Sequence, residues 1–411
     1  MRLAGGWGVA LVAALILSVF LAAPLVSPKP ELLAGAVSSS PRAAVRPPAV
    51  PVPEPLPGET RPAFPHWPPA AWRSGPAGEV RFSDLPDDSA VALQQALDRV
   101  RQGLGLQAMT VGLAVDGQEY WAGASGIALD GVSAIDGDSP FVIASITKTF
   151  TAALVMQLVE AGRLSLDQEV APLLPDVGVA RGITIRQLLG HTSGIADLLA
   201  PMRKPMTDHP ARHWRAEEVM ARLGDPWFAP GATYAYSNSN YVLLGLLVER
   251  TYGRPFADVL ERHLLRPLHL DETGVLLGRG APKLMSRSWA SAFGTSGYMY
   301  SSASDLLEWG TALYGGRVLD AETLQQMVVF NRDEYGLGTE LIHLGKRSGV
   351  GHSGLLRGYT SLLVHLPKEK MTLVVIGAWQ GFDPRGALLY EQTKADASIL
   401  EVALQVASQR R

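Results

Sequence analysis

Hydrophobic residues at the start of the chain form one uninterrupted segment. No charged residue occurs from 3 to 26, and the run 9–21 is almost wholly apolar. About 20 apolar residues suffice for a helix to cross a bilayer, and the positive charge of Arg2 and the amino terminus favours a cytoplasmic N-terminus with the rest exported. Residues 1–26 are therefore predicted to be a signal peptide or a transmembrane anchor, and Pro24, which hinders cleavage, slightly favours the anchor.

The next segment is dominated by proline. Residues 27–78 hold 14 of the 29 prolines of the chain. Such a segment cannot build a helix or sheet interior and favours extended polyproline II, which acts as a semi-rigid spacer. We expect residues 27–78 to be a linker that holds the folded domain, residues 79–411, outside the cytoplasm, in the periplasm or at the cell surface, anchored to the cytoplasmic membrane.

Hydrophobic residues with the period of a helix or of a strand appear only beyond the linker. Residues 89–101 and 395–408 read as helices, and the middle, from 147 to about 313, is mostly helical. Two strands, 110–115 and 118–122, meet at Asp116-Gly117, which is a hairpin signal. A second strand pair lies at 360–366 and 371–378. Strands at both ends with helices between them predict an α+β fold, in which an antiparallel sheet is flanked by N- and C-terminal helices and carries an inserted, mostly helical domain.

Composition narrows the chemistry. The chain is 47% hydrophobic and 18% charged, so it is not a long disordered chain. A net charge of −3 gives no reason to expect nucleic acid as a partner. The absence of cysteine excludes a disulfide scaffold, a thiolate metal site and a cysteine nucleophile.

One helix start carries a candidate nucleophile. Ser145 precedes a helix pattern that runs to Gly162, and Lys148, three residues on, shares a helix face with it. A serine hydroxyl becomes nucleophilic when a nearby base accepts its proton, and a buried lysine can be that base. The alternative is a capping serine beside a solvated lysine. The apolar character of this helix, and the fact that no other Ser-x-x-Lys occurs, favour the catalytic interpretation.

Two further short motifs are ambiguous on their own. Tyr236 and Asn238 form the single Tyr-x-Asn of the chain, and a phenol can relay a proton while an amide can bind a substrate amide. His352-Ser353-Gly354 lies in a Gly-rich stretch before the 360–366 strand, where a glycine on a strand edge admits another backbone. The alternatives are a loop tyrosine with a capping asparagine, and a surface histidine on an edge strand.

Taken in order, Ser-x-x-Lys, Tyr-x-Asn and His-x-Gly form the pattern of the penicillin-recognising serine hydrolases. The chain resembles the branch that contains class C beta-lactamases, D-alanyl-D-alanine carboxypeptidases and related esterases. The resemblance covers roughly residues 80–405 and includes the segments 183–194, 230–245, 266–268 and 297–305.

The resemblance implies a mechanism for these residues. Ser145 attacks a carbonyl and forms an acyl-enzyme, and Lys148, Tyr236 or the two together accept and return protons. The backbone N–H groups of Ser145 and Leu355 form the oxyanion hole, and Asn238 holds the acyl-side amide. The substrate is a small molecule or a peptide, with a cell-wall peptide as one candidate. No metal or cofactor is required.

One departure from the family pattern concerns the third motif. Class C beta-lactamases carry Lys-Thr-Gly where this chain has His352-Ser353-Gly354, and a histidine is largely neutral at pH 7. We therefore expect a carboxypeptidase or esterase rather than an efficient beta-lactamase, with Arg357 as a candidate for the missing cation. His191 lies in a similar His-Thr-Ser-Gly segment, but it precedes Tyr236 in the chain and is interpreted as structural.

Two other functional classes compete with the hydrolase. The same cleft could sense cell-wall fragments as a non-catalytic binding module on a membrane stalk, although a binder has no need of Lys148 beside Ser145. Alternatively, the protein could be a structural or adaptor protein that works through the proline-rich segment. An α/β-hydrolase is disfavoured because no Gly-x-Ser-x-Gly elbow occurs.

Overall fold

The computed structural model describes residues 87–117, 119–179, 181–356, 358–378, 383–391 and 396–409. The predicted signal or anchor (1–26) and the predicted linker (27–78) lie outside the described residues. In the part that is described, no helix has the length and apolar character needed to span a membrane.

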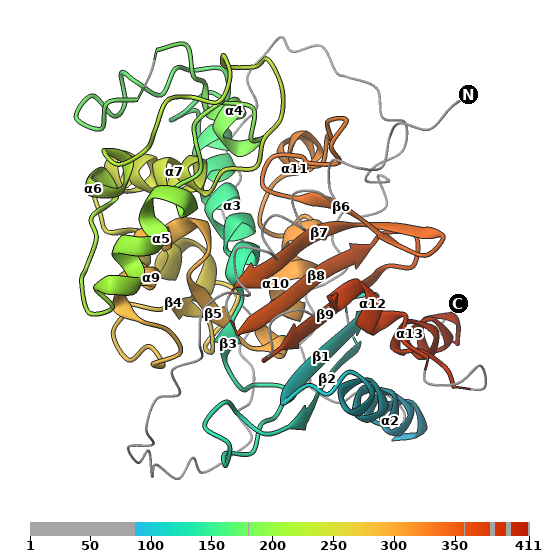
Figure 1. Ribbon diagram of the computed structural model, residues 1–411. Helices are drawn as coiled ribbons and strands as arrows, with labels where there is room; N and C mark the ends of the chain where they lie inside the picture. Colours follow the sequence, from blue (N-terminus) through green and yellow to red (C-terminus); the bar gives the residue numbers. More distant parts are fainter. Residues whose placement is uncertain are drawn as a thin grey trace, which may run out of the picture.

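A six-stranded sheet forms the centre of the molecule, in the order β2-β1-β9-β8-β7-β6 (Figure 1). Every neighbouring pair is antiparallel. The strands are β1 (Ala108–Val115), β2 (Glu119–Gly126), β6 (Glu340–Leu344), β7 (Arg347–Leu356), β8 (Tyr359–Leu366) and β9 (Met371–Gly377).

The two ends of the chain meet in this sheet, as the sequence predicts. β1 pairs with β9 in a register that places Val111 opposite Val375. The β1–β2 connection is the predicted tight turn, with Asp116 at φ 55° and Gly117 at φ 67°. Val115 pairs with Glu119 across this connection, and the positive φ values of Asp116 and Gly117 reverse the direction of the chain between them.

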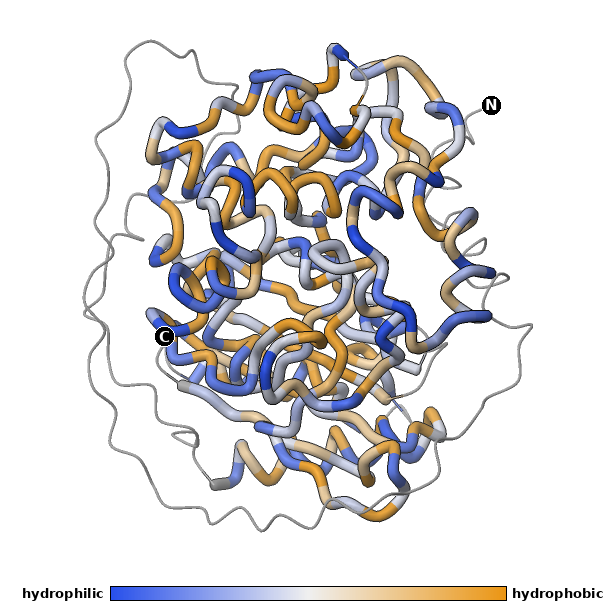
Figure 2. The backbone as a smooth tube through the Cα atoms, turned by 90° about the vertical axis from the view of Figure 1, so that its left-hand side faces the viewer, coloured by the Kyte–Doolittle hydropathy of each residue, from blue (hydrophilic) through white to orange (hydrophobic). Residues whose placement is uncertain are grey.

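Helices cover both faces of the sheet. Side chains alternate along β1, so that Met109, Val111 and Leu113 pack under α2 (Asp87–Gly103) and α13 (Ile399–Ser408). The opposite face packs against α10 (Ala303–Tyr314). Hydrophobic and hydrophilic residues accordingly alternate along most segments in Figure 2.

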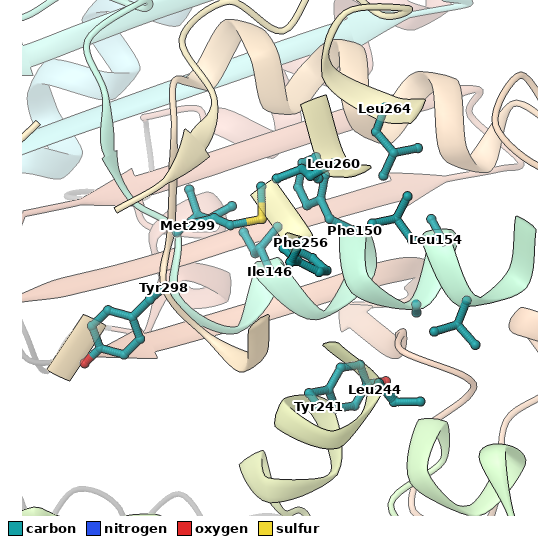
Figure 3. Close-up of a cluster of buried hydrophobic side chains, with 14 of the residues drawn as sticks. Ile146, Phe150, Leu154, Tyr241, Leu244, Phe256, Leu260, Leu264, Tyr298 and Met299 are labelled. Carbon is teal, nitrogen blue, oxygen red and sulfur yellow. The ribbon is translucent and has the colours of Figure 1, made fainter. Parts of the chain in front are cut away.

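The remaining elements form the inserted, mostly helical domain. At its centre α3 is buried along nearly its whole length, and Figure 3 shows Ile146, Phe150 and Leu154 among side chains from neighbouring segments. Phe150 also stacks on Trp309 of α10, with ring centroids 3.9 Å apart. The helices of this part and its surroundings are α3 (Thr147–Glu160), α4 (Ile185–Leu189), α5 (Leu199–Asp208), α6 (Ala216–Met220), α7 (Asn238–Tyr252), α8 (Phe256–Leu260), η3 (Glu261–Leu265), α9 (Arg287–Phe293), η4 (Gly294–Ser296), α11 (Ala321–Met327) and α12 (Pro384–Leu388).

The α+β architecture with its flanking helices is confirmed, but the sequence pattern missed several strands. β6 and β7 are absent from the prediction, and in β7 the reason is that Gly349, Gly351 and Gly354 interrupt the alternation of apolar and polar residues. A three-stranded sheet, β3 (Phe141–Val142), β5 (Met299–Ser301) and β4 (Gly274–Val275), was also missed because its strands are too short to show a period.

Candidate active site

Ser145 lies in a short turn that leads into α3. This turn, η2 (Ala144–Ile146), is a 3₁₀ turn, and α3 begins at Thr147. Ala144 has φ 47°, a left-handed conformation that is unusual for a residue with a side chain. Such strain persists only where the surrounding structure holds it, and it is often found at functional sites.

Lys148 is fully buried directly beside Ser145. Its Nζ lies 3.1 Å from Ser145 Oγ, 2.9 Å from Asn238 Oδ1 and 2.6 Å from the carbonyl oxygen of Ser296. The two carbonyl-type oxygens can only accept hydrogen bonds, so a neutral lysine that donates to both presents its lone pair to the Ser145 hydroxyl. The site therefore orients a neutral amine as a base for that hydroxyl.

The electrostatic surroundings keep this amine near neutrality. Burial lowers the pKa of Lys148 to about 7, and the charges of Asp197 and Glu340 oppose that shift without cancelling it. Near pH 7 a large fraction of Lys148 is therefore unprotonated.

Tyr236 is the second residue that contacts Ser145 Oγ. Its hydroxyl donates to Ser145 Oγ at 2.9 Å, and Lys148 Nζ lies 4.7 Å from the centre of its ring. Burial of the phenol raises the pKa of Tyr236 well above its usual value of 10, so the group is protonated at neutral pH. This arrangement suits Tyr236 as a proton donor and suits Lys148 as the acceptor.

Asn238 is the first residue of α7, and Asp197 holds it in place. Its Oδ1 accepts from Lys148, while its backbone N–H and its Nδ2 donate to Asp197 Oδ2 at 2.5 and 2.9 Å. Asp197 is half-buried, and burial raises its pKa. Asp197 was not predicted from the sequence, because nothing near it in the chain distinguishes it from other loop aspartates.

The third motif lies inside β7 rather than before the next strand. A Cβ at Gly354 would overlap the carbonyl oxygen of Ile143 and Ser361 Oγ, and Ala144 Cβ lies 3.1 Å away. Gly354 therefore lets β7 approach the segment that leads to Ser145. Ser353 N–H points to the β6 side, where it reaches the Glu340 carboxylate, and N–H groups on a strand share a side at every second residue. Leu355 N–H thus points to the same side as Ser353 N–H.

His352 is not a surface residue. It is 1% exposed within β7, with Nε2 3.0 Å from Tyr335 OH and Nδ1 2.6 Å from the carbonyl oxygen of Ser353. Burial lowers the pKa of His352, so the ring is neutral at pH 7. The alternative of a surface histidine on an edge strand is wrong, because β7 lies between β6 and β8.

Glu340 is a second acidic residue that the sequence analysis missed. Its carboxylate accepts from Ser353 N–H at 3.0 Å and from Ser353 Oγ at 2.8 Å. Arg385 Nη2 of α12 lies 3.6 Å from the same carboxylate. Arg357, the predicted cation, lies outside the described residues.

His191 lies behind Tyr236. It is fully buried, its ring centre is 4.3 Å from that of Tyr236, and its Nδ1 accepts from Ser237 N–H at 3.2 Å. Burial lowers the pKa of His191 well below 6.5. This neutral ring contacts Tyr236 from behind, which fits the structural interpretation. Among the residues that the structure describes, no cluster of three or more His, Asp or Glu side chains is placed to hold a metal ion.

Known proteins share this sequence and fold. A family model described as Beta-lactamase matches residues 93–396. Penicillin-binding protein 4 of Amycolatopsis lactamdurans is 29% identical over 320 residues, which cover 67% of this chain and 81% of that protein.

Solved structures agree with the family match. The D-stereospecific amidohydrolase from Streptomyces sp. is 30% identical with a TM-score of 0.60, covering 71% of this chain and 94% of that one. The D-amino acid amidase from Ochrobactrum anthropi SV3 is 25% identical with a TM-score of 0.66, covering 79% and 100%. The chain belongs to the beta-lactamase family of penicillin-recognising serine hydrolases.

Proposed function

We propose that this protein is an exported, membrane-tethered hydrolase that cleaves a peptide, amide, ester or lactam bond through an acyl-enzyme on Ser145. The observation that carries the proposal is the contact of Ser145 Oγ with both Lys148 Nζ, at 3.1 Å, and Tyr236 OH, at 2.9 Å. A nucleophile needs a base within this distance, and the leaving group needs a proton donor.

In the acylation step, neutral Lys148 takes the proton of Ser145 Oγ as that oxygen attacks the substrate carbonyl carbon. The N–H groups of Ser145 and Leu355 bind the oxyanion. As the bond to the leaving group breaks, Tyr236 donates its proton to the leaving atom and regains one from protonated Lys148. The acyl group is then an ester of Ser145, and Lys148 is again neutral.

In the deacylation step, a water molecule takes the place of the leaving group. Neutral Lys148, directly or through Tyr236, accepts a proton from this water as its oxygen attacks the acyl ester. The ester bond breaks, Ser145 Oγ regains the proton, and the acid product departs. The proton that Ser145 loses to the leaving group in acylation is replaced by one from water in deacylation, so no further reactant is needed.

The names of the relatives support a substrate class. Two of the similar structures are described as a D-stereospecific amidohydrolase and a D-amino acid amidase, and one relative is named a penicillin-binding protein. We take amides and esters with a D-amino acyl group as the first class to test. Export rests on the apolar segment 1–26 and the linker 27–78, which would place the substrate outside the cytoplasm.

The test is hydrolysis of a nitrophenyl ester by the full-length protein and by its Ser145→Ala variant. We expect the wild type to hydrolyse the ester, whereas Ser145→Ala does not. Ester hydrolysis that persists unchanged in Ser145→Ala would overturn the proposal. A wild type that hydrolyses no ester would favour the non-catalytic binding module.

A further inference from the structure

The edge of β7 beside Ser145 extends past the end of its neighbouring strand. β6 begins at Glu340, which pairs with Gly351. Ser353 and Leu355 lie beyond this point, so no described strand pairs with them on the β6 side. The Glu340 side chain bends along this edge and accepts both hydrogen bonds that Ser353 offers there, from N–H at 3.0 Å and from Oγ at 2.8 Å.

The position of Tyr236 indicates which part of a substrate lies over this edge. The leaving atom must reach the proton donor, Tyr236, whose hydroxyl donates to Ser145 Oγ and whose ring centre lies 6.5 Å from that of His352 in β7. Tyr335 contacts both rings, at 6.1 and 5.6 Å. A carbonyl held between Ser145 and Leu355 N–H therefore directs its leaving group along β7 towards Ser353 and Glu340.

The polar and charged groups along this part of β7 are poorly suited to bind a substrate carboxylate. The donors of Ser353 are already bonded to Glu340, and His352 is buried with both ring nitrogens in contact with protein oxygens. Lys148 is buried and engaged with Ser145 and Asn238. Arg385 lies 3.6 Å from Glu340 and is 34% exposed, so its charge is partly screened by solvent and already paired.

A carboxylate in this position would face the Glu340 carboxylate with no unoccupied Ser353 donor. Two like charges in contact are repelled, and a carboxylate oxygen offers no proton to a second one. An amide, amine or hydroxyl group would instead find Glu340 as an acceptor. The same residue thus disfavours one class of leaving group and favours another.

We propose that Glu340 determines leaving-group specificity and selects substrates whose leaving group carries no carboxylate. The inference rests on the proposed function of Ser145 and narrows it. The protein acts on amides or esters with a neutral or cationic leaving group, and acts poorly on peptides that release an amino acid with a free carboxylate.

The test compares two esters that differ only in the leaving group, 3-acetoxybenzamide and 3-acetoxybenzoate. Glu340→Gln removes the charge and keeps the shape of the side chain. Glu334→Gln is the matched control, because Glu334 is an exposed carboxylate on the preceding loop whose partner is His343, at 2.9 Å. The intrinsic reactivity of the two esters cancels when the kcat/KM ratio of a variant is divided by that of the wild type.

We expect the wild type to favour the benzamide ester at least about tenfold in kcat/KM, consistent with like-charge repulsion at short range. Glu340→Gln should lower this ratio about tenfold, mainly through faster hydrolysis of the benzoate ester, and Glu334→Gln should preserve it. The wild-type preference should also shrink between about 0.1 and 1 M salt, where the screening length falls from about 10 to 3 Å.

An unchanged ratio in Glu340→Gln, or an equal fall in Glu334→Gln, would overturn the role of Glu340. If Glu340→Gln does not fold, the salt dependence of the wild type tests the role of Glu340 instead. A preference for the benzamide ester that salt does not alter would overturn the inference. Absence of Ser145-dependent hydrolysis of both esters is a different result, because it removes the proposed function itself. Turnover of either ester by the wild type but not by Ser145→Ala separates the two failures.

Discussion

Lys148 is the residue whose chemistry depends most on its surroundings. An exposed lysine is an ammonium ion near pH 7 and cannot accept a proton. Full burial removes the water that stabilises the ammonium form, so the pKa of Lys148 falls to about 7 even though Asp197 and Glu340 oppose the shift. Burial thereby turns an ordinary lysine into a candidate base, and contact with Asn238 and Ser296 orients it.

The pH dependence of turnover tests this role. If unprotonated Lys148 accepts the Ser145 proton, kcat/KM should be low below pH 7, rise as pH passes through about 7, and level off above it. Glu340→Gln should move this rise to lower pH, since the charge of Glu340 raises the pKa of Lys148. Initial rates with a neutral ester from pH 5 to pH 9 would measure both effects.

Lys148→Arg is the companion variant. An arginine stays protonated and cannot act as the base, so kcat should fall by about 10² to 10⁴. A rise near pH 7 that persists in Lys148→Arg would contradict the assignment of this titration to Lys148.

At the scale of elements, the contact between β7 and η2 sets the width of the proposed oxyanion hole. Gly354 permits this contact, and Ser361 Oγ also donates to the Ile143 carbonyl at 2.8 Å. The segment before Ser145 is thus held between two strands, β7 and β8. The strained φ of Ala144 is maintained by this packing.

Gly354→Ala should therefore reduce catalysis more than stability. The added methyl group overlaps the Ile143 carbonyl oxygen and must push β7 away from Ser145. We expect kcat to fall by about 10² to 10³, as for the loss of one oxyanion donor. Steady-state kinetics measure the loss. Gly224→Ala is the control, because a Cβ there meets no atom within 4 Å, and equal losses in both variants would contradict the role of the contact.

At the scale of the whole molecule, the site forms where the sheet meets the helical domain. The helical domain supplies Ser145, Lys148 and Asn238, and the sheet supplies Ser353 and Leu355. Tyr236 comes from the loop before α7. Neither part of the fold contains a complete site, so the proposed activity depends on the packing of one against the other.

Buried neutral histidines make this fold sensitive to acid. His365 lies in β8 at 5% exposure, contacts Thr372 Oγ1 at 2.9 Å, and has its pKa lowered by burial to about 3. In the unfolded chain this histidine gains a proton below about pH 6.5, whereas in the folded protein it does not. Its contribution to stability is therefore present above pH 6.5 and is lost progressively as pH falls towards 3.

His365→Gln should consequently flatten the pH dependence of stability. Between pH 6.5 and pH 4 the titration of His365 removes about 3 kcal/mol from the free energy of unfolding. The variant should be less stable at pH 7 but should lose less stability on acidification. Urea unfolding at several pH values measures the slope of the free energy of unfolding against pH. His209→Gln is the matched control, because His209 is exposed. An unchanged slope in His365→Gln would contradict the prediction.

The sequence by itself determined the features that depend on neighbours in the chain. The Asp116-Gly117 hairpin, the flanking helices and the shared helix face of Ser145 and Lys148 follow from local conformational preferences and the helical period. The order of the three motifs was also sufficient to predict the family, and strands at both ends with helices between them were sufficient to predict the α+β fold.

Tertiary structure alone decided the properties that depend on burial and on distant partners. Asp197 and Asn238 are 41 residues apart, and Ser145 and Tyr236 are 91 apart. The burial of His352, the lowered pKa of Lys148 and the position of Glu340 beside Ser353 have no local signal. A pKa shift or a hydrogen bond in the interior arises from the removal of water and from contacts made only when remote segments pack together.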